Sequence, residues 1–275
     1  MLNSINLNAS ALIALQNLSA IQQQLAQEQT IISTGKKINS PKDNGAIWSI
    51  AQTMQGKVIS LDAVKDSLNR GQSTIDVAMA AGQQVSDLLQ QMKAKALAAS
   101  DTSLDAVSRE ALNEDFKQLR DQINRVVSNA DFNGVNMVKH AGTTLYALAN
   151  DSGSSRLTVQ AQDLSLGGTN VTLSATASFS TAASASAFLG TLDANIQSVN
   201  LAMTHLGTGS NAMASQLKFV GGLQDSLNTG ISNLVDADMA EESAKLQALQ
   251  TKQQLAIQAL TIANQSNAIL LQLFR

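Results

Sequence analysis

Two tetrapeptides have the Ser-x-x-Lys spacing of serine acyl-transfer enzymes: Ser33 with Lys36, and Ser215 with Lys218. In such enzymes the serine hydroxyl attacks the substrate, and an oxyanion hole on a β-sheet scaffold stabilises the intermediate. The sequence around both serines offers neither a companion motif nor an oxyanion loop, and Ser215 lies within a seven-residue apolar repeat. An acyl-transfer enzyme is therefore a weak alternative, and its signature would be covalent labelling of Ser33.

The glycine-rich segment 207–212 matches the Gly-x-Gly-x-x-Ala spelling of a dinucleotide-binding turn. Such a turn binds pyrophosphate when it follows a β-strand and opens a helix. Here the segment follows a helical repeat, so the cofactor-binding interpretation fails. We expect either a loosened or a closely packed stretch of helix between Leu206 and Met213.

Four acids gather near the start of the last predicted helix: Asp236, Asp238, Glu241 and Glu242. They could suggest a metal site, but acids at this position also stabilise the positive end of a helix dipole, which is the stronger interpretation. His140 and His205 are far apart in sequence, and there is no cysteine to supply a thiolate. We expect no catalytic residue, no metal, no cofactor and no enzymatic activity.

The composition favours long helices packed side by side over a globular enzyme core. Charged residues make up 14% of the 275 residues and aromatic residues 3%. An average soluble domain carries about 25% charged residues. The single proline, Pro41, leaves few enforced helix breaks, and a core with so few aromatic rings must be built from aliphatic side chains and methionine.

The charge pattern also bounds the partners. A net charge of −3 without a basic run argues against nucleic-acid binding, which needs clustered lysine and arginine. No apolar stretch approaches the roughly 18 residues of a membrane-spanning helix, so we expect no membrane insertion. The first residues lack a basic segment followed by an apolar one, so we expect no cleaved secretory signal.

Apolar residues recur every seven positions in the first half of the chain, over residues 47–96, with a second series offset by three over residues 50–92. Two such series are the a and d positions of a coiled coil and predict one long helix. Ser40 can cap this helix, Pro41 suits its first position, and Asp43 places a carboxylate in the first turn.

The second half repeats the pattern, with one seven-residue series over residues 192–234 and a companion over residues 189–231. A shorter amphipathic helix is indicated from Leu112 to Val126 and should end near Asn133 and Gly134. None of the three helices can bury its apolar seam alone, so we expect them to share one long antiparallel bundle.

The intervening segment changes to short, alternating, Ser/Thr/Gly-rich patterns. Residues 145–149 and 157–159 flank a polar loop and predict a β-hairpin, and residues 164–166 with 171–173 predict a second, weaker strand pair. The fold class is therefore mainly α, with a small β-hairpin region.

The two ends of the chain are also amphipathic and are unusually poor in charge: residues 246–274 contain one lysine, Lys252, and no acid. Such helices make poor solvated surfaces, so we expect protein on both faces, although the two ends could simply pair with each other. The proposed assembly seam consists of Leu18, Ile21, Leu25, Ile32, Leu246, Leu249, Ile257, Leu260, Leu271 and Phe274.

Four motifs resemble those of bacterial flagellin, in that family's order and at its distances from the two ends. They are the opening Asn3–Asn8, the segment Ile31–Asp43, the segment Asn233–Glu242, and Ile262–Ser266 with the final Leu273-Phe274-Arg275. The resemblance covers roughly residues 1–140 and 185–275. The short stretch between them implies a minimal flagellin that lacks outer domains, similar to those of stalked α-proteobacteria.

The resemblance implies a division of the chain in which both ends form a paired-helix inner core domain and the middle forms a rod domain. The expected segments are 1–44 (inner core and spoke), 45–140 (rod helices), 141–185 (rod hairpin), 186–232 (rod helix) and 233–275 (inner core). The spoke that joins core to rod would contain Ser33, Gly35, Lys36, Asn39, Pro41 and Asp43.

The implied function is self-assembly into the filament that propels the cell, with terminal segments that fold on assembly, in an extracellular polymer exported without a cleaved signal peptide. Implied partners are other flagellin subunits, an export chaperone, the filament cap and hook-associated proteins. A hook–filament junction protein of the same export system is the alternative, although we would expect it to match residues 33–43 less well.

Two further expectations come from the same resemblance. Gln91 stands where the innate-receptor epitope of many flagellins has an arginine, which predicts weak or absent recognition by that receptor. O-glycosylation is expected on exposed hydroxyl groups of the hairpin region, with the candidates Thr143, Thr144, Ser154, Thr172 and Ser178.

Overall fold

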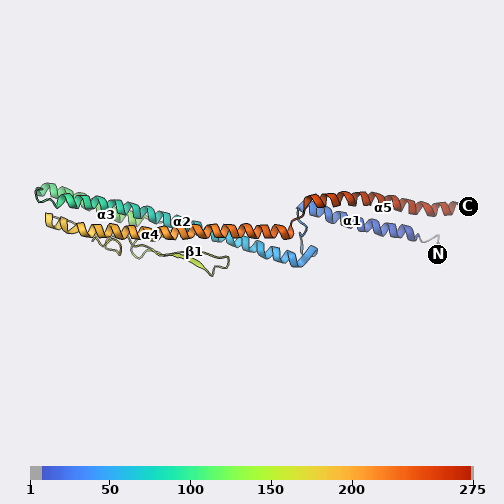
Figure 1. The fold of residues 1–275 in the computed structure, drawn as a ribbon, viewed down its shortest axis with the longest axis horizontal. Helices are drawn as coiled ribbons and strands as arrows, with labels where there is room; N and C mark the ends of the chain where they lie inside the picture. Colours follow the sequence, from blue (N-terminus) through green and yellow to red (C-terminus); the bar gives the residue numbers. More distant parts are fainter. Residues whose placement is uncertain (1–7, 274–275) are drawn as a thin grey trace. The chain divides into compact units, whose positions relative to one another are not determined.

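The structure is a computed structural model that describes the backbone of residues 8–273 and the side chains of residues 8–265. In chain order its elements are α1 (Ala9–Thr34), α2 (Pro41–Ala99), α3 (Ala106–Asn129), β1 (Leu145–Leu148), β2 (Arg156–Val159), α4 (Ala182–Val235) and α5 (Met239–Leu273) (Figure 1). They divide into two compact units: Lys57–Asp225, and the two ends of the chain up to Gly56 and from Ser226.

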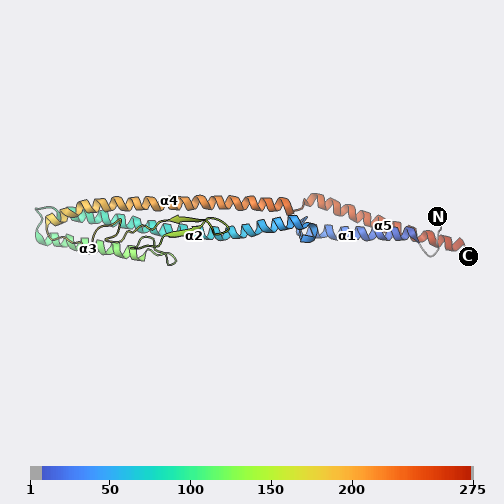
Figure 2. The same cartoon turned by 90° about the horizontal axis from the view of Figure 1, so that it is seen from below.

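The unit Lys57–Asp225 is a bundle in which parts of α2 and α4 lie side by side with α3 (Figure 1, Figure 2). Its core is made of the predicted seven-residue series, including the fully buried Leu68, Ile75 and Leu89 of α2 and Leu192 and Leu206 of α4. The coiled-coil interpretation of both halves is therefore confirmed, with leucine, isoleucine and methionine replacing the missing aromatic rings.

The companion series in α2 does not begin where the sequence analysis placed it. Ile50 is exposed, whereas Ala51 and Val58, each four residues after a position of the main series, are buried. From Leu61 to Val64 the buried positions then follow at a spacing of three, and the regular repeat continues. This interruption is a stammer, which is equivalent to the loss of four residues from the heptad repeat. It overwinds the coiled coil locally and moves the buried stripe to other positions of the helix.

α3 begins at the side chain of Asp105, which accepts a hydrogen bond from the Ser108 backbone N–H at 2.8 Å, and it ends at Asn129. The predicted end near Asn133 and Gly134 was wrong by four residues. Asn133 and Gly134 both have positive φ (53° and 80°), which no helix can continue, and they form the tight turn that follows the helix.

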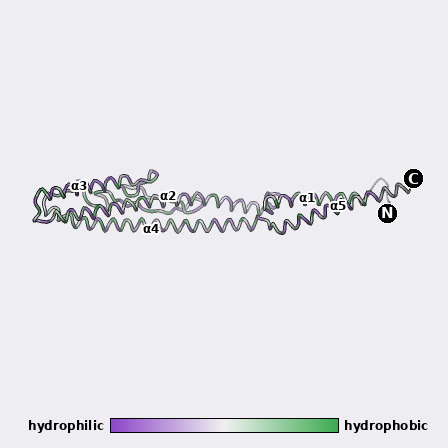
Figure 3. Tube along the Cα trace, turned by 90° about the horizontal axis from the view of Figure 1, so that it is seen from above, coloured by the Kyte–Doolittle hydropathy of each residue, from purple (hydrophilic) through white to green (hydrophobic). Residues whose placement is uncertain are grey.

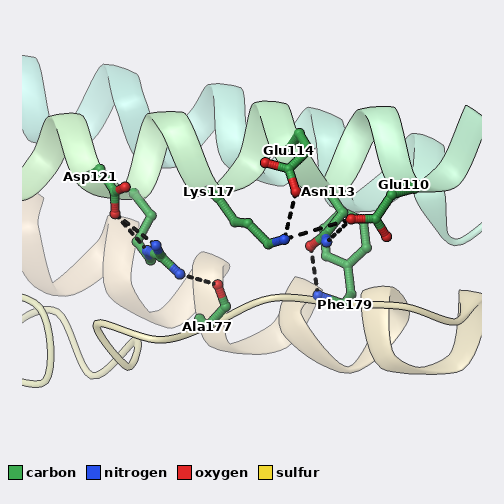
Figure 4. Close-up of polar contacts among 8 residues, drawn as sticks. Glu110, Asn113, Glu114, Lys117, Asp121, Ala177 and Phe179 are labelled. Atoms are coloured by element: carbon green, nitrogen blue, oxygen red, sulfur yellow. Dashed lines mark hydrogen bonds and ion pairs between the residues drawn. The ribbon is translucent and has the colours of Figure 1, made fainter.

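α3 holds the extended segment before α4 through polar contacts (Figure 4) and through contacts between aromatic rings. Asn113 Oδ1 accepts a hydrogen bond from the Phe179 N–H at 2.9 Å, and Arg120 donates to the Ala177 carbonyl at 2.9 Å. Phe116 packs edge-on against Phe179, with ring centroids 5.1 Å apart. Three of the eight aromatic residues in the chain are thus used to seal this end of the bundle, since Phe188 also lies against Phe116.

The hairpin lies where it was predicted. β1 and β2 are antiparallel, with Leu145 opposite Val159 and Leu148 opposite Arg156. The predicted second strand pair is reduced to one bridge between Leu166 and Val171. The reason lies in Asp163, whose carboxylate accepts the Ser165 N–H at 3.0 Å and draws the chain into a local turn that leaves no room for a ladder.

The glycines at 207 and 209 lie inside the continuous helix α4, and they differ in what surrounds them. A Cβ built on Gly209 would come within 2.7 Å of a methyl group of Val159 in β2, whereas one built on Gly207 would meet nothing within 4 Å. Of the two expectations for this stretch, close packing is the correct one, because Gly209 is where the hairpin rests on α4.

This difference provides a matched test of hairpin docking. Gly209→Ala should lower the free energy of unfolding by about 1–3 kcal/mol, because the stiff β-branched Val159 cannot move aside within its strand. Gly207→Ala should raise it by about 1 kcal/mol through helix propensity alone. Urea unfolding of both purified variants measures the two values, and equal effects would contradict the docking contact.

Candidate functional site: the paired terminal helices

The two ends of the chain form an antiparallel helix pair, α1 with α5, which lie side by side in both views (Figure 1, Figure 2). Asn8 caps α1 by accepting the Ala11 N–H at 3.0 Å, and its amide group donates to the Ala263 carbonyl of α5 at 2.8 Å. At its other end α1 stops at Gly35, whose φ of 70° suits glycine and whose N–H donates to the Ile31 carbonyl.

One face of each helix is buried or half-buried in the seam between them, with alternating spacings of three and four residues. The seam positions are Leu18, Ile21, Leu25, Glu28 and Ile32 in α1, and Glu242, Leu246, Leu249, Gln253, Ala256 and Leu260 in α5. Most of the residues assigned to an assembly seam therefore lie in the contact between the two ends of one chain. The pairing of the ends, which the sequence left open, is what the structure shows.

The remaining seam candidates lie elsewhere. Ile257 points away from the pair and its side chain is 49% exposed. Leu271 belongs to the backbone of α5, but its side chain is outside the described residues, as is the whole of Phe274. An assembly role for these three residues stays a prediction.

A second apolar surface lies on the outside of the helix pair, and sequence reasoning missed it. Its large exposed side chains are Ile13, Leu255 and Ile262, whereas Leu12, Leu15 and Ile257 are exposed elsewhere on the two helices. Part of this surface is hollowed into a groove of about 900 Å³ that runs between the two helices and is lined by Ile13, Ile21, Leu255 and Ile262. Apolar residues recur along both helices (Figure 3), so the signal was present in their number, which exceeds what one seam can bury.

The seam contains a pair of facing carboxyl groups, Glu28 and Glu242, which are 9% and 8% exposed. A hydrogen bond to Glu242 and burial raise the pKa of Glu28, while hydrogen bonds to Glu28 and Lys245 lower the pKa of Glu242. Lys245 pairs with Glu242 at 3.0 Å and with Glu241 at 2.9 Å, and these contacts raise the pKa of its ammonium group. Of the two carboxyl groups, Glu28 is therefore the one that holds a proton more tightly.

Main-chain hydrogen bonds connect the spoke segment to the chain between α4 and α5. The Lys37 N–H donates to the Val235 carbonyl at 2.8 Å, and the Ala237 N–H donates to the Gly35 carbonyl at 2.9 Å. Ile38 is buried beside them against Val235 and Ala51. The spoke is therefore a two-stranded clamp, a long-range pairing that no local sequence signal announced.

Asp43 organises the turn that follows the clamp. Its carboxylate accepts hydrogen bonds from the N–H groups of Asn39 (3.0 Å) and Ser40 (2.9 Å), and these bonds lower its pKa. Asn44 has extended backbone angles, and its side chain accepts the Ile47 N–H at 3.1 Å. The cap of the long helix is therefore Asn44 and not Ser40, because the first turn from Pro41 is broken before the regular helix begins.

The glycosylation candidates all lie in the unit Lys57–Asp225, where Thr143, Ser154, Thr172 and Ser178 are exposed and Thr144 is half-buried. The Thr172 hydroxyl donates to the side chain of Asn195 at 2.9 Å, and the Thr144 hydroxyl to Gln160 at 3.2 Å. Their modification stays a prediction.

The motifs that imitate enzyme sites have structural partners. The Ser33 hydroxyl donates to the Thr30 carbonyl of its own helix at 2.9 Å. Asp238 caps α5 by accepting the Ala240 N–H at 2.9 Å. Within residues 8–273 no group of histidine, cysteine and acidic side chains could hold a metal ion. No helix in that range is long and apolar enough to cross a membrane.

A unit built on long helical seams, and a separate helix pair that carries an exposed apolar groove, are typical of the class of self-associating helical structural subunits. The family model of the bacterial flagellin N-terminal helical region matches residues 5–143, and that of the bacterial flagellin C-terminal helical region matches residues 189–274. The chain belongs to the bacterial flagellin family.

Similar proteins extend over the full length. The chain is 57% identical to flagellin FljM of Caulobacter vibrioides, covering 100% of this chain and 99% of that protein. It is 36% identical to a flagellin of Brucella melitensis, covering 99% of each chain. The crystal structure of Bacillus cereus flagellin has the same fold, with a TM-score of 0.51 and 21% identity over 56% of this chain and 88% of that one.

These matches assign the function of the chain. It is a short flagellin similar to α-proteobacterial ones, a structural subunit of the bacterial flagellar filament and not an enzyme. The alternative of a hook–filament junction protein is not favoured.

The turn at Asp43 can be tested directly. Asp43→Asn should speed amide hydrogen exchange at Asn39 and Ser40 several-fold, because a neutral amide accepts their N–H groups less strongly than a carboxylate does. The lowered pKa gives the same loosening in the unaltered chain as pH falls through the pKa of Asp43, below its ordinary 3.8.

The matched control for this experiment is Asp236→Asn, which removes an exposed carboxylate from the partner segment of the clamp. Exchange at residues 39 and 40 should not respond to it. Unchanged exchange in the Asp43 variant, or a turn that tightens as pH falls, would contradict the role given to Asp43.

Proposed function

We propose that subunits of this flagellin pack against one another through the outer apolar face of the α1–α5 pair, with the groove at Ile13 and Ile262 receiving a helix of a second copy. The observation that carries the proposal is the 900 Å³ groove, together with side chains such as Ile262 that are left 67% exposed. An exposed apolar groove of this size marks an interaction site.

The energetics favour burial of this face. Fully burying one large aliphatic side chain contributes about 1.5–3 kcal/mol, so several together can offset the cost of association. Charge opposes it little, because Glu28 is the one charged residue between Ala9 and Thr34, and Lys252 is the one charged residue among those that line the groove. Packing many copies therefore requires few ions to leave water without a partner.

The same face explains why the ends would fold on assembly. Each helix of the pair buries only one seam within its own chain, and the groove side gains a partner only when a second copy arrives. Segments that cannot bury enough apolar surface alone stay disordered until binding supplies it. We therefore propose that docking at the growing tip orders the ends and that this ordering accompanies polymerisation.

Family resemblance supports several finer proposals. The segments 1–44 and 233–275 would form the inner core of the filament, and the intervening residues its rod. An export chaperone, the filament cap and hook-associated proteins would be the further partners. Export would proceed without cleavage of a signal peptide, into an extracellular filament whose hairpin region carries O-linked glycans.

Charge reversal of the groove tests the docking surface. Ile13→Asp should abolish filament formation, because each contact would bury an unpaired carboxylate, and it should leave the α1–α5 seam intact. Val107→Asp is the matched control: Val107 is 82% exposed at the start of α3, where an acid suits the helix dipole. Seeded polymerisation followed by sedimentation and electron microscopy measures the outcome.

A contrasting variant separates the two apolar surfaces. Leu25→Asp should abolish filaments by breaking the seam inside one chain, since Leu25 is buried between α1 and α5. Far-ultraviolet circular dichroism of the monomeric variants compares their helix content. The helix content of Leu25→Asp should be lower than that of Ile13→Asp. Normal filaments from the Ile13→Asp variant would overturn the docking proposal.

A further inference from the structure

The seam of the α1–α5 pair contains an unusual element, a carboxyl group at a core position. Glu28 occupies the place in the repeat between Leu25 and Ile32 where an apolar residue would pack, and it is 9% exposed. The facing side chain is Glu242, which is 8% exposed, so the two carboxyl groups meet inside the seam. Two buried carboxylates in contact repel each other strongly, and such a contact forms readily only when they share a proton.

The hydrogen bonding identifies where the proton sits. Lys245 and the contact with Glu28 both favour the charged form of Glu242. Glu28 Oε1 is buried and has no hydrogen-bond partner among the described residues. An ionised Glu28 would carry part of its charge on this unsatisfied atom, whereas a protonated Glu28 donates to Glu242 and leaves only a neutral carbonyl oxygen unpaired.

The other charged residues near Glu28 all belong to α5 or to the residue that caps it. Glu241, Glu242, Lys245 and Lys252 of α5 face or neighbour it, Asp238 lies at the start of the same helix, and α1 supplies no other charge. Lys245 is already engaged by Glu241 and Glu242. Among the described residues no ion pair joins Glu28 to Lys252 or to another cation, so protonation is the means by which Glu28 is neutralised.

A shallow groove of about 360 Å³ lies beside this carboxyl pair, lined in part by Gln24, Gln27 and Lys252. Gln24 and Lys252 also line the larger apolar groove, so the two hollows are continuous along the same helix pair. A second copy that covers the apolar groove would also remove water from around Glu28. Burial of this kind further favours the neutral form.

From this arrangement we propose that filament assembly is linked to proton uptake: each subunit takes up one proton at Glu28 when its ends pair and a neighbouring copy covers them. The inference rests on the proposed docking of α1–α5 pairs and names the condition that regulates it. Glu28 and Glu242 together act as a proton-dependent latch in the seam, which opens when the shared proton is lost.

The direction of the pH dependence follows from the folded and free states. Glu28 holds its proton more tightly in the paired state than in the free chain, so its contribution is complete below the ordinary glutamate value of 4.5 and is lost as pH rises through its raised pKa. Glu242 has a lowered pKa, so its contribution is lost only as pH falls below that ordinary range. Assembly should weaken toward alkaline pH.

The experiment measures the critical concentration for polymerisation of the full chain between about pH 5 and about pH 9, a range that brackets a raised glutamate pKa. For the unaltered chain it should rise by up to about tenfold per pH unit between the ordinary glutamate pKa and the raised pKa of Glu28, and level off above the raised value, as expected for one linked proton. Glu28→Gln should remove this slope, because the glutamine amide donates to Glu242 at every pH and its oxygen replaces Oε1.

Glu241→Gln is the matched control, since it removes an exposed carboxylate of the same cluster that also pairs with Lys245. It should keep the pH slope of the unaltered chain. A pH-stat measurement adds a direct readout: at a pH between the ordinary glutamate pKa and the raised pKa of Glu28, polymerisation should take up as much as about one proton per subunit in the unaltered chain and none in Glu28→Gln.

The outcomes separate the two proposals. Polymers whose critical concentration is independent of pH, or a Glu28→Gln variant with an unchanged slope, would overturn the proton linkage and leave the docking surface standing. Absence of polymers from the unaltered chain at every pH would overturn both. A slope lost in Glu28→Gln and kept in Glu241→Gln is the result that supports the latch.

Discussion

The antiparallel contact between the two ends of the chain governs everything else at the assembly surface. Neither α1 nor α5 has a partner for its apolar seam until the other arrives from more than two hundred residues away in sequence. The main-chain clamp at Lys37 and Val235 provides the fixed point at which the two helices start side by side. From that point the seam proceeds with leucine and isoleucine until it reaches the carboxyl pair at Glu28.

A buried polar group in an otherwise apolar seam lowers stability and can raise specificity. A leucine at the position of Glu28 would allow the helices to slide or to pair in other registers, because apolar side chains accept many partners. The contact with Glu242 satisfies only one register, as single polar residues at core positions of coiled coils do. The carboxyl pair and the clamp therefore favour the same register of α1 against α5.

The unit Lys57–Asp225 solves a different problem, which is to pack long helices with few aromatic rings. Small residues bring backbones close, as Gly209 does where Val159 rests on α4. The aromatic rings of Phe116 and Phe179 are reserved for one end of the bundle. The core is therefore made of similar aliphatic side chains along its length. Its local irregularities, such as the phase shift of the repeat near Leu61, come from what each stretch of helix packs against.

Periodicity along the chain was sufficient to predict the long helices, the bundle and the hairpin, because helix and strand repeats are properties of neighbouring residues. The order of the motifs along the chain was sufficient to predict the flagellin family. Boundaries were less predictable: α3 ends before Asn133, and the long helix is capped by Asn44 instead of Ser40. Both errors concern turns whose dihedral angles compete with helix formation through side-chain hydrogen bonds that spacing alone does not reveal.

The sequence by itself determined that the two ends carry apolar seams and little charge, because composition and periodicity depend only on the identity and spacing of neighbouring residues. Which residues face inward was decided only by the tertiary structure. The seam took Leu25 and Leu260, left Ile257 and Ile262 outside, and brought Glu28 against Glu242. The reason is geometric: a helix with apolar residues around more than one face can bury only one of them against a single partner, and the clamp between distant segments selects which.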